Sequence, residues 1–427
     1  MVAFLGIIQF ISIAGCCMYE LKIKSSAVFL WAVLLIMFGI PHMLSAIMGT
    51  YSYTTSTMRE ASIFVILFTI IYLLVRYIFR NKKSTQGKED KLQLLENEQK
   101  GMTNFMYVLF AIMVVIVFIR IVSLSKQAGG LFNTSWETMR QTGGYFSFAQ
   151  IFTPIFFASS SCILLAIKIK DKKFIIFSII IILIEVLISR NRIEILPIFV
   201  AIIYAYILKE NKIGLKKIFI LGCIGIISIY CIYALRVFRH SGSAKNFIDM
   251  YNLKTFNLKV FDYLENDDGE LGLRKYMYYF IENDNNFQNF GKGHTYLRML
   301  FVLIPTKWSF GLKPDDFAIT MGKAILPNST GFSMHPTLFG DVYANFGFYG
   351  FLWGAFWAIF VNMIDRIIEK RNKIIYLPLT FIFCISYIIE ARGSVYNGFV
   401  WSVYGYVILI FIYIVFKVVK NSVSKNN

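Results

Sequence analysis

Residues 331–350 read GFSMHPTLFGDVYANFGFYG, a polar loop that carries His335 and Asp341 and runs directly into an apolar helix. This loop closes the long hydrophilic segment of the chain, residues 236–334, whereas the other polar stretches are short connectors between apolar runs. Apolar runs of about 20 residues are typical of transmembrane helices. The sequence therefore predicts a membrane bundle that supports one large loop outside the membrane. We look for a catalytic site first at residues 331–350, where this loop joins the bundle.

The composition places the chain among integral membrane proteins. Hydrophobic residues make up 57% of the 427 residues and charged residues only 16%, which is outside the range of soluble globular domains. The formal net charge of +18 is compatible with nucleic-acid binding, but the basic residues are scattered through connectors rather than clustered on a soluble face. We therefore expect no nucleic-acid partner and one all-α polytopic membrane domain over residues 1–427.

The apolar runs predict about eleven transmembrane helices, which begin near residues 2, 27, 61, 104, 147, 174, 193, 217, 343, 374 and 396. Only SRNR separates the sixth run from the seventh, so these two form either a tight hairpin or a pair of shorter, tilted segments. The six cysteines fall inside apolar runs without metal-type spacing. They are read as small buried hydrophobes, and we expect neither a metal nor a cofactor.

The distribution of Lys and Arg predicts the orientation, because cytoplasmic connectors retain positive charge. One alternate set of connectors carries 23 basic residues, and the short connectors of the opposite set carry 6. We expect the N-terminus outside, the C-terminus inside, residues 81–103 as a cytoplasmic loop and residues 236–334 as an outer loop.

The outer loop has apolar residues at helical spacing over residues 247–264 and 273–281, which predicts short helices lying on the bundle. Residues 291–305 are too few to span the membrane and favour an interfacial or re-entrant helix ended by Pro305. Small-residue spacing in the ninth run indicates close helix packing at Gly347, Gly350 and Gly354.

The outer ends of several runs carry arginine, which is a candidate ligand for phosphate. The planar guanidinium binds phosphate oxygens in a bidentate manner and stays charged. Lys313, before Pro314, is a further candidate. The alternative is structural: the arginines extend to the interface, Arg190 and Arg192 pair with Glu185 and Glu194, or Arg392 pairs with Glu390. The candidate pyrophosphate ligands are Arg190, Arg192, Arg236, Arg239, Arg392 and Lys313, and Arg120 lies near the outer end of the fourth run.

His335 and Asp341 are the candidate catalytic residues. Imidazole titrates near neutral pH, and a carboxyl group lies within the same short segment. A lone loop histidine is more often a surface or hydrogen-bonded residue, and Asp315 and Asp316 could equally be a solvated pair or supply a base. No HExxH, Walker A or GxSxG motif occurs in a suitable context.

Three segments carry a resemblance to the Wzy-type O-antigen and oligosaccharide repeat-unit polymerases of bacteria. They are SRNRIEILP at 189–197, GHTYLRMLFVLIPTKWSFGLKP at 293–314 and HPTLFGDVYANFGFYG at 335–350. The layout of spans with one large outer loop is similar as well. The resemblance implies a GT-C-like membrane bundle in the bacterial inner membrane that performs an inverting, metal-independent glycosyl transfer in lipopolysaccharide or other polysaccharide biosynthesis.

The resemblance also implies partners and roles. The substrates would be oligosaccharides linked to undecaprenyl pyrophosphate, and a chain-length regulator protein is a possible partner. The related O-antigen ligases have a histidine at a similar distance before a glycine-rich helix start as His335 before Gly347, although this chain reads HPTLFGD where ligases tend to have paired His and Asn. The arginine after a mid-chain span matches Arg190 or Arg192. Other readings are a ligase, a flippase or transporter of lipid-linked oligosaccharide, and a receptor or scaffold without chemistry.

Overall fold

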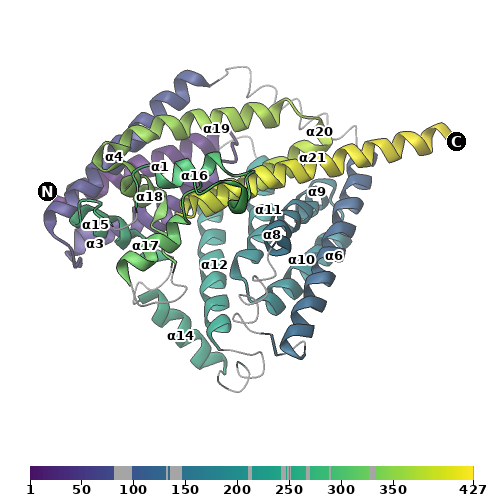
Figure 1. The fold of residues 1–427 in the computed structure, drawn as a ribbon, viewed down its shortest axis with the longest axis horizontal. Coiled ribbons are helices and arrows are strands. Elements are labelled where there is room, and N and C mark those ends of the chain that lie inside the picture. The colour runs from purple at the N-terminus through teal and green to yellow at the C-terminus, as the bar shows by residue number, and fades with distance from the viewer. Residues whose placement is uncertain are drawn as a thin grey trace. The chain divides into compact units, whose positions relative to one another are not determined.

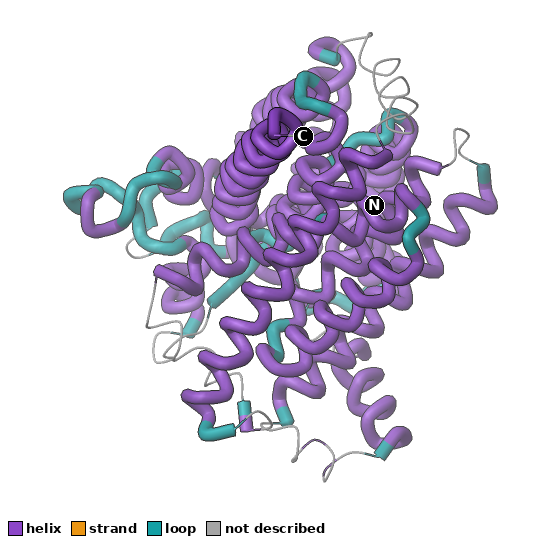
Figure 2. The backbone as a smooth tube through the Cα atoms, turned by 90° about the vertical axis from the view of Figure 1, so that its right-hand side faces the viewer, coloured by secondary structure: helices purple, strands orange, loops and turns teal. Residues whose placement is uncertain are grey.

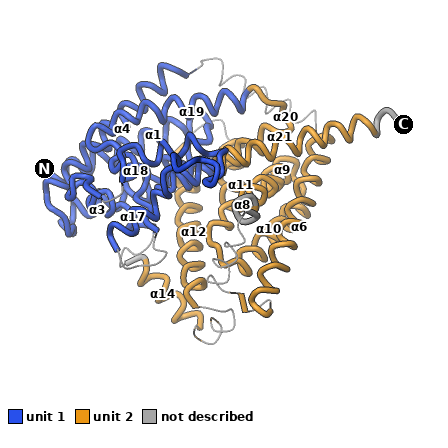
Figure 3. The backbone as a smooth tube through the Cα atoms, in the orientation of Figure 1, with its two compact units in different colours: residues 1–85, 267–369, 386–400 blue, residues 86–266, 370–385, 401–427 orange. Residues whose placement is uncertain are grey.

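The computed structural model describes residues 1–80, 99–130, 133–134, 147–209, 214–241, 247, 250, 252–265, 270–287, 290–326 and 333–426. Within these ranges the chain forms helices and connecting loops and no strand (Figures 1 and 2). Most of the expected cytoplasmic loop 81–103 lies outside the described residues. The chain divides into two compact units, coloured separately in Figure 3.

Unit 1 comprises residues 1–85, 267–369 and 386–400. Its elements are α1 (Val2–Lys22), α2 (Val28–Leu34), η1 (Leu35–Gly39), α3 (Ile40–Met48), α4 (Thr55–Phe79), η5 (Leu271–Arg274), α15 (Lys275–Glu282), α16 (His294–Leu300), η6 (Thr306–Trp308), α17 (Phe317–Ile325), α18 (Thr337–Phe346), η7 (Phe348–Leu352) and α19 (Trp353–Glu369). It also holds the end of α20 (Lys373–Ala391) and the start of α21 (Val395–Asn426).

Unit 2 comprises residues 86–266, 370–385 and 401–427. Its elements are α6 (Gln99–Ala128), α8 (Ser147–Ser160), α9 (Cys162–Ile169), α10 (Lys172–Ser189), η4 (Arg192–Ile195), α11 (Leu196–Lys209), α12 (Leu215–His240) and α14 (Leu253–Glu265), with the remainder of α20 and α21.

Nine helices of the described residues are long and apolar enough to cross a membrane. They coincide with nine of the eleven expected runs, which confirms the all-α polytopic membrane class. The remaining two runs, near 174 and 193, correspond to α10 and α11. Three charged residues within the 18 residues of α10 and the short 14-residue length of α11 keep both below that threshold. The spans are Val2–Lys22, Val28–Met48, Thr55–Phe79, Gln99–Ala128, Phe152–Ile169, Lys216–His240, Phe348–Glu369, Lys373–Ala391 and Val395–Ser422.

The second span contains a π-helical turn with a local cause. Pro41 lies in the first turn of α3, and proline has no N–H to donate back along the helix. The preceding residues of η1 form the wider π-turn, the kind of irregularity that accommodates a broken hydrogen-bond ladder. The span therefore continues to Met48 across the proline.

His42, one residue after Pro41, is fully buried and joins α15 to two of the candidate spans. Its Nδ1 lies 2.5 Å from the Tyr278 hydroxyl of α15, and its Nε2 lies 2.8 Å from Ser62 Oγ of α4. Since Ser62 Oγ donates to Met58 O at 3.0 Å, it accepts from His42, and Tyr278 donates to the other ring nitrogen.

The packing of α4 against α19 uses the expected small residue. A Cβ on Gly354 would lie 2.4 Å from the Phe68 carbonyl oxygen, so only glycine permits this approach. The close packing predicted for Gly354 is confirmed.

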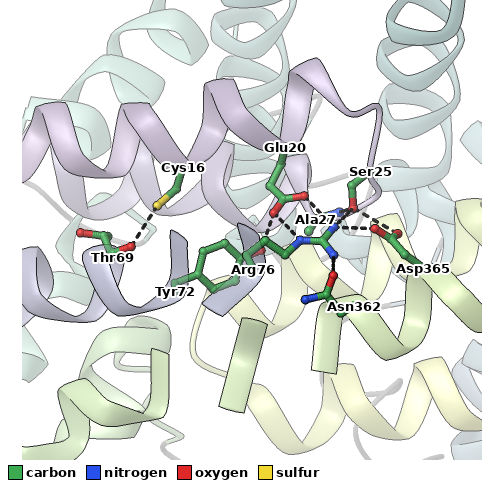
Figure 4. A network of polar contacts seen from close by, with 9 residues as sticks. All are labelled: Cys16, Glu20, Ser25, Ala27, Thr69, Tyr72, Arg76, Asn362 and Asp365. Atoms are coloured by element: carbon green, nitrogen blue, oxygen red, sulfur yellow. Dashed lines mark hydrogen bonds and ion pairs between the residues drawn. The ribbon is translucent and has the colours of Figure 1, made fainter. Parts of the chain in front are cut away.

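A buried ionic network joins α1, α4 and α19 (Figure 4). Arg76 is 1% exposed, and it donates to Glu20 through Nε at 2.8 Å and to Asp365 through Nη2 at 2.5 Å. Asn362 accepts from Nη1 and Ser25 from Nη2. Removing one partner of such a buried pair costs about 3–5 kcal/mol, so we interpret the network as a clamp between three spans.

The short helices expected in the outer loop correspond to α14 and α15 with η5. The expected helix over 291–305 is shorter, because α16 ends at Leu300 and turns follow up to Pro305. Proline disfavours the α conformation in the residue before it, which is consistent with a helix that stops ahead of Pro305.

Candidate functional site

Asp341 of α18 is fully buried and is held by neutral polar groups. Its Oδ2 accepts a hydrogen bond from Thr295 Oγ1 of α16 at 3.2 Å, and its Oδ1 accepts from Asn345 Nδ2 at 3.2 Å. Asn345 and Thr295 bond each other twice, through Thr295 N to Oδ1 and Nδ2 to Thr295 Oγ1, both at 3.1 Å. Among the described residues, no basic side chain forms an ion pair with Asp341.

The chain reaches this network through a glycine. Gly293 precedes α16 with a left-handed φ of 80°, which glycine adopts without strain. Its N–H donates to the Asn345 carbonyl at 3.2 Å. The turn thereby starts α16 beside α18 and places Thr295 against Asp341.

A small cleft with an enclosed volume of about 10 Å³ opens beside Asp341 within unit 1. Asp316 contributes a second carboxyl group to its wall while capping α17, since its Oδ1 accepts from Ala318 N at 3.0 Å and Ile319 N at 3.4 Å. The cleft therefore combines two carboxyl groups with aromatic, hydroxyl and amide side chains. The wall comprises Thr295, Asp316, Phe317, Ala318, Asp341, Gly393, Ser394, Val395, Tyr396 and Asn397.

The segment of His335 lies directly against the turn between α20 and α21. Thr337 N donates to the Arg392 carbonyl at 3.1 Å, and a Cβ on Gly393 would lie 2.4 Å from that same nitrogen. Thr337 has a φ of 62°, an outlier for a β-branched residue. Such strain costs about 1–3 kcal/mol and is concentrated at functional sites. His335 itself is half-buried and does not line the cleft.

Two cations stand over one aromatic ring of the cleft. Arg298 Cζ lies 4.4 Å and Lys313 Nζ 5.7 Å from the ring centroid of Tyr396. Backbone carbonyls fix both side chains, since Arg298 Nη1 donates to Pro314 O and Lys313 Nζ donates to Ile304 O at 2.8 Å. Lys313 was a predicted phosphate ligand, whereas Arg298 was not.

The electrostatic environment shifts two groups of this site, both outside the nine candidate spans. Burial raises the pKa of Asp341 well above its ordinary value, opposed by the Thr295 hydrogen bond and assisted by the charge of Asp316. Burial and the neighbouring Arg298 charge lower the pKa of Lys313. Asp341 thus binds a proton more readily than an exposed carboxylate does, which suits a group that accepts one.

Arg392 belongs to the same unit and forms an ion pair. Its Nε lies 2.6 Å from Glu270 Oε2, with both side chains less than a fifth exposed. The structure therefore gives Arg392 a partner in Glu270 rather than the Glu390 considered from the sequence. Its backbone touches the His335 segment, while its guanidinium serves this ion pair.

The remaining predicted arginines belong to unit 2 and gather where α10 and α12 end. Arg190 has a φ of 54°, lies 4.4 Å from the ring centroid of Phe238 and donates to the Phe238 carbonyl at 3.2 Å. Phe238 lies between Arg236 and Arg239 on the last turns of α12, and Arg236 stands 4.6 Å from the ring of Tyr263. Arg192 begins η4.

The acids considered as partners of Arg190 and Arg192 both bind Arg120. Arg120 Nη1 lies 2.7 Å from Glu185 Oε1 and 2.5 Å from Glu194 Oε1. Ser189 Oγ and Asn191 Nδ2 complete the contacts of Glu194 at 2.6 and 2.9 Å. Arg120 is thus the cation of a structural cluster of α6, α10 and η4.

The structure groups the predicted residues into one set in each unit. His335, Asp341, Lys313 and Arg392 share unit 1, and Arg190, Arg192, Arg236 and Arg239 share unit 2. Comparison of the chain with family models, curated proteins and solved structures gave no match. The function is therefore argued from the residues and the geometry of the site.

Proposed function

We propose that the chain is a glycosyltransferase of the bacterial inner membrane that polymerises oligosaccharide repeat units carried on polyprenyl pyrophosphate. A hydroxyl oxygen of the acceptor sugar forms a bond to the anomeric carbon of the donor glycan. The bond between that carbon and the pyrophosphate oxygen breaks, and the hydroxyl proton moves to a base. The products are a lengthened glycan and polyprenyl pyrophosphate.

The observation that carries this proposal is the buried carboxyl group of Asp341 in a cleft with polar and aromatic walls. A general base must reach the hydroxyl proton and have a pKa near the working pH. Asp341 lines the cleft, and its pKa is raised by burial and by Asp316. We assign the proton transfer to Asp341. His335 does not line the cleft, and we assign it the positioning of the segment that carries Asp341.

The remaining walls of the cleft suit a sugar. Tyr396 offers an aromatic ring, while Ser394 and Asn397 offer a hydroxyl and an amide that can bond sugar hydroxyl groups. Pockets of this kind combine apolar surface with a few placed polar groups. A neutral polar glycan fits these groups better than an apolar substrate.

The leaving pyrophosphate requires positive charge, because charge builds on it as the bond breaks. In unit 1 that charge is supplied by Arg298 and Lys313 over Tyr396. Arg190, Arg192, Arg236 and Arg239 stay candidate pyrophosphate ligands in unit 2, and Arg392 acts through its ion pair with Glu270. The transfer uses no metal and no cofactor in this proposal.

The proposed test uses purified full-length protein in vesicles with a polyprenyl pyrophosphate-linked oligosaccharide, and the product ladder is resolved on a gel. Asp341→Asn keeps an oxygen that accepts from Thr295 but cannot take the proton, so the transfer rate should fall about 10²–10⁴-fold. His335→Gln should keep most of the activity that His335→Ala loses, because glutamine retains hydrogen bonding. The exposed Asp284→Asn is the matched control and should behave as the unchanged protein.

Each alternative function has its own outcome. Single transfer to a different acceptor glycolipid, without a ladder, indicates a ligase, and movement of lipid-linked oligosaccharide across the vesicle membrane without transfer indicates a flippase. Full activity of Asp341→Asn would show that Asp341 is not the general base. A chain-length regulator, if it acts here, would narrow the distribution of ladder lengths when added.

A further inference from the structure

A short segment after α16 exposes large apolar side chains although it belongs to none of the nine candidate spans. We name residues 297–313 the apolar lobe. Its most exposed apolar side chains are between 64% and 93% exposed, and they are Leu300, Leu303, Trp308, Phe310 and Leu312. Exposed apolar surface of this extent marks a site of contact with a partner or a membrane.

The backbone of the apolar lobe is tied to itself, so these side chains are held outward. Lys313 Nζ donates to Ile304 O at 2.8 Å and closes the base of the lobe. Within it, Leu312 N donates to Ser309 O at 2.9 Å and Ser309 Oγ to Thr306 O at 2.8 Å. The lobe is therefore a preformed structure.

The tip of the lobe is conformationally strained. Phe310 has a φ of 49° and Gly311 a φ of 78°, so two successive residues are left-handed. A left-handed conformation is unfavourable for a residue with a side chain. Here it directs Phe310, which is 93% exposed, away from the protein.

The base of the lobe contacts the first turn of a candidate membrane span. Arg298 and Lys313, at its two ends, both stand over the ring of Tyr396. Tyr396 is in the first turn of α21, whose span runs from Val395 to Ser422. Tyr and Trp are enriched at this boundary between membrane and water, and Trp308 of the lobe is 72% exposed.

The charge of the lobe is of one sign. Residues 297–313 include Arg298, Lys307 and Lys313 and no acidic residue, and the first acids after them are Asp315 and Asp316. Basic residues beside exposed aromatic and aliphatic side chains are typical of segments that lie in the headgroup region of anionic membranes. We propose that the apolar lobe inserts into the lipid bilayer beside the cleft, with Phe310 in the acyl region and Lys307 on anionic headgroups.

The test places the photoreactive residue p-benzoylphenylalanine at Phe310 in the full-length protein, in vesicles of phosphatidylethanolamine and phosphatidylglycerol. After irradiation, mass spectrometry should find a phospholipid adduct at position 310. The same residue at Asn286, an exposed polar turn of unit 1, should give none. An adduct with a second copy of the chain, or no adduct at position 310, would overturn the proposal.

A second measurement tests the charge. Lys307→Glu should lower the yield of phosphatidylglycerol adduct about five-fold, because the anionic headgroup loses its contact. Lys323→Glu, at an exposed lysine of α17, is the matched control and should leave the yield unchanged. An equal yield from Lys307→Glu and Lys323→Glu would refute the anionic headgroup contact. Both readouts are independent of glycosyl transfer, so the lobe and the enzymatic function can fail separately.

Discussion

Asp341 is fully buried among neutral polar groups, and no described basic side chain forms an ion pair with it. An ionised carboxylate in such surroundings loses solvation, which is why burial raises its pKa. The folded state then binds the proton more tightly than the unfolded chain. The free energy of unfolding therefore falls as pH rises from the ordinary value of 3.8 through the raised pKa. This loss of stability is the cost of keeping a proton acceptor in the cleft.

The same shift predicts the pH dependence of activity. The base acts as the ionised form, so the rate should rise with pH along an acid limb whose midpoint lies well above 3.8. Thr295 donates to Asp341 and lowers its pKa. Thr295→Val should therefore move the acid limb to higher pH, while the plateau rate falls less than in Asp341→Asn.

The matched control for this pH profile is Thr320→Val, since the Thr320 hydroxyl donates to the Asp316 backbone carbonyl at 3.1 Å and makes no contact with Asp341. Its acid limb should coincide with that of the unchanged protein. An unmoved limb in Thr295→Val would mean that another group supplies the proton acceptor.

Elements of the site meet through backbone contacts that side-chain patterns do not predict. Gly393, in the turn between α20 and α21, touches the strained residue Thr337 at the start of α18. The sequence indicated His335 and Asp341 because they stand together in one segment. Arg298 and Tyr396 are far apart in the sequence, so no local spacing could pair them, and only the fold shows the contact.

Apolar periodicity predicted the membrane spans well, because a bilayer imposes length and hydropathy on each helix. It was less informative for α10 and α11, because Glu185 of α10 pairs with Arg120 and α11 has only 14 residues, and for α16, which stops before the run of apolar residues ends. In both regions, tertiary contacts or backbone chemistry determine where the helices begin and end, which the apolar residues alone do not predict.

Adding one methyl group at the turn between α20 and α21 should lower both transfer activity and thermal stability. Gly393 has a φ of 94°, and a Cβ there would lie 2.4 Å from Thr337 N. Gly393→Ala should therefore separate the turn from the His335 segment, with loss of transfer activity and a fall in thermal stability of several degrees. Gly291→Ala adds a methyl group with no heavy atom within 4 Å and should change neither quantity.

Thermal unfolding in detergent and the ladder assay measure these two effects. If Gly393→Ala keeps full activity, close contact between the turn and the His335 segment is not needed for the reaction. If Gly291→Ala is as damaging as Gly393→Ala, glycine flexibility rather than this contact explains the loss.

For the whole molecule, the imbalance of 23 to 6 basic residues between alternate connectors predicts the orientation. Lys292, just before α16 in the loop expected to lie outside, and Lys370, between α19 and α20, are both exposed. In intact cells, Lys292→Cys should react with a membrane-impermeant thiol reagent, whereas Lys370→Cys should react only after the cells are permeabilised. The unmodified chain measures the background from its own six cysteines, which are buried or half-buried.

The proposed reaction requires that Lys292→Cys reacts in intact cells. The apolar lobe and the Asp341 cleft belong to the same unit as Lys292, and a lipid-linked glycan displayed on the outer face must reach them. Labelling of Lys370→Cys alone in intact cells would place that cleft on the cytoplasmic side and exclude polymerisation at the outer face.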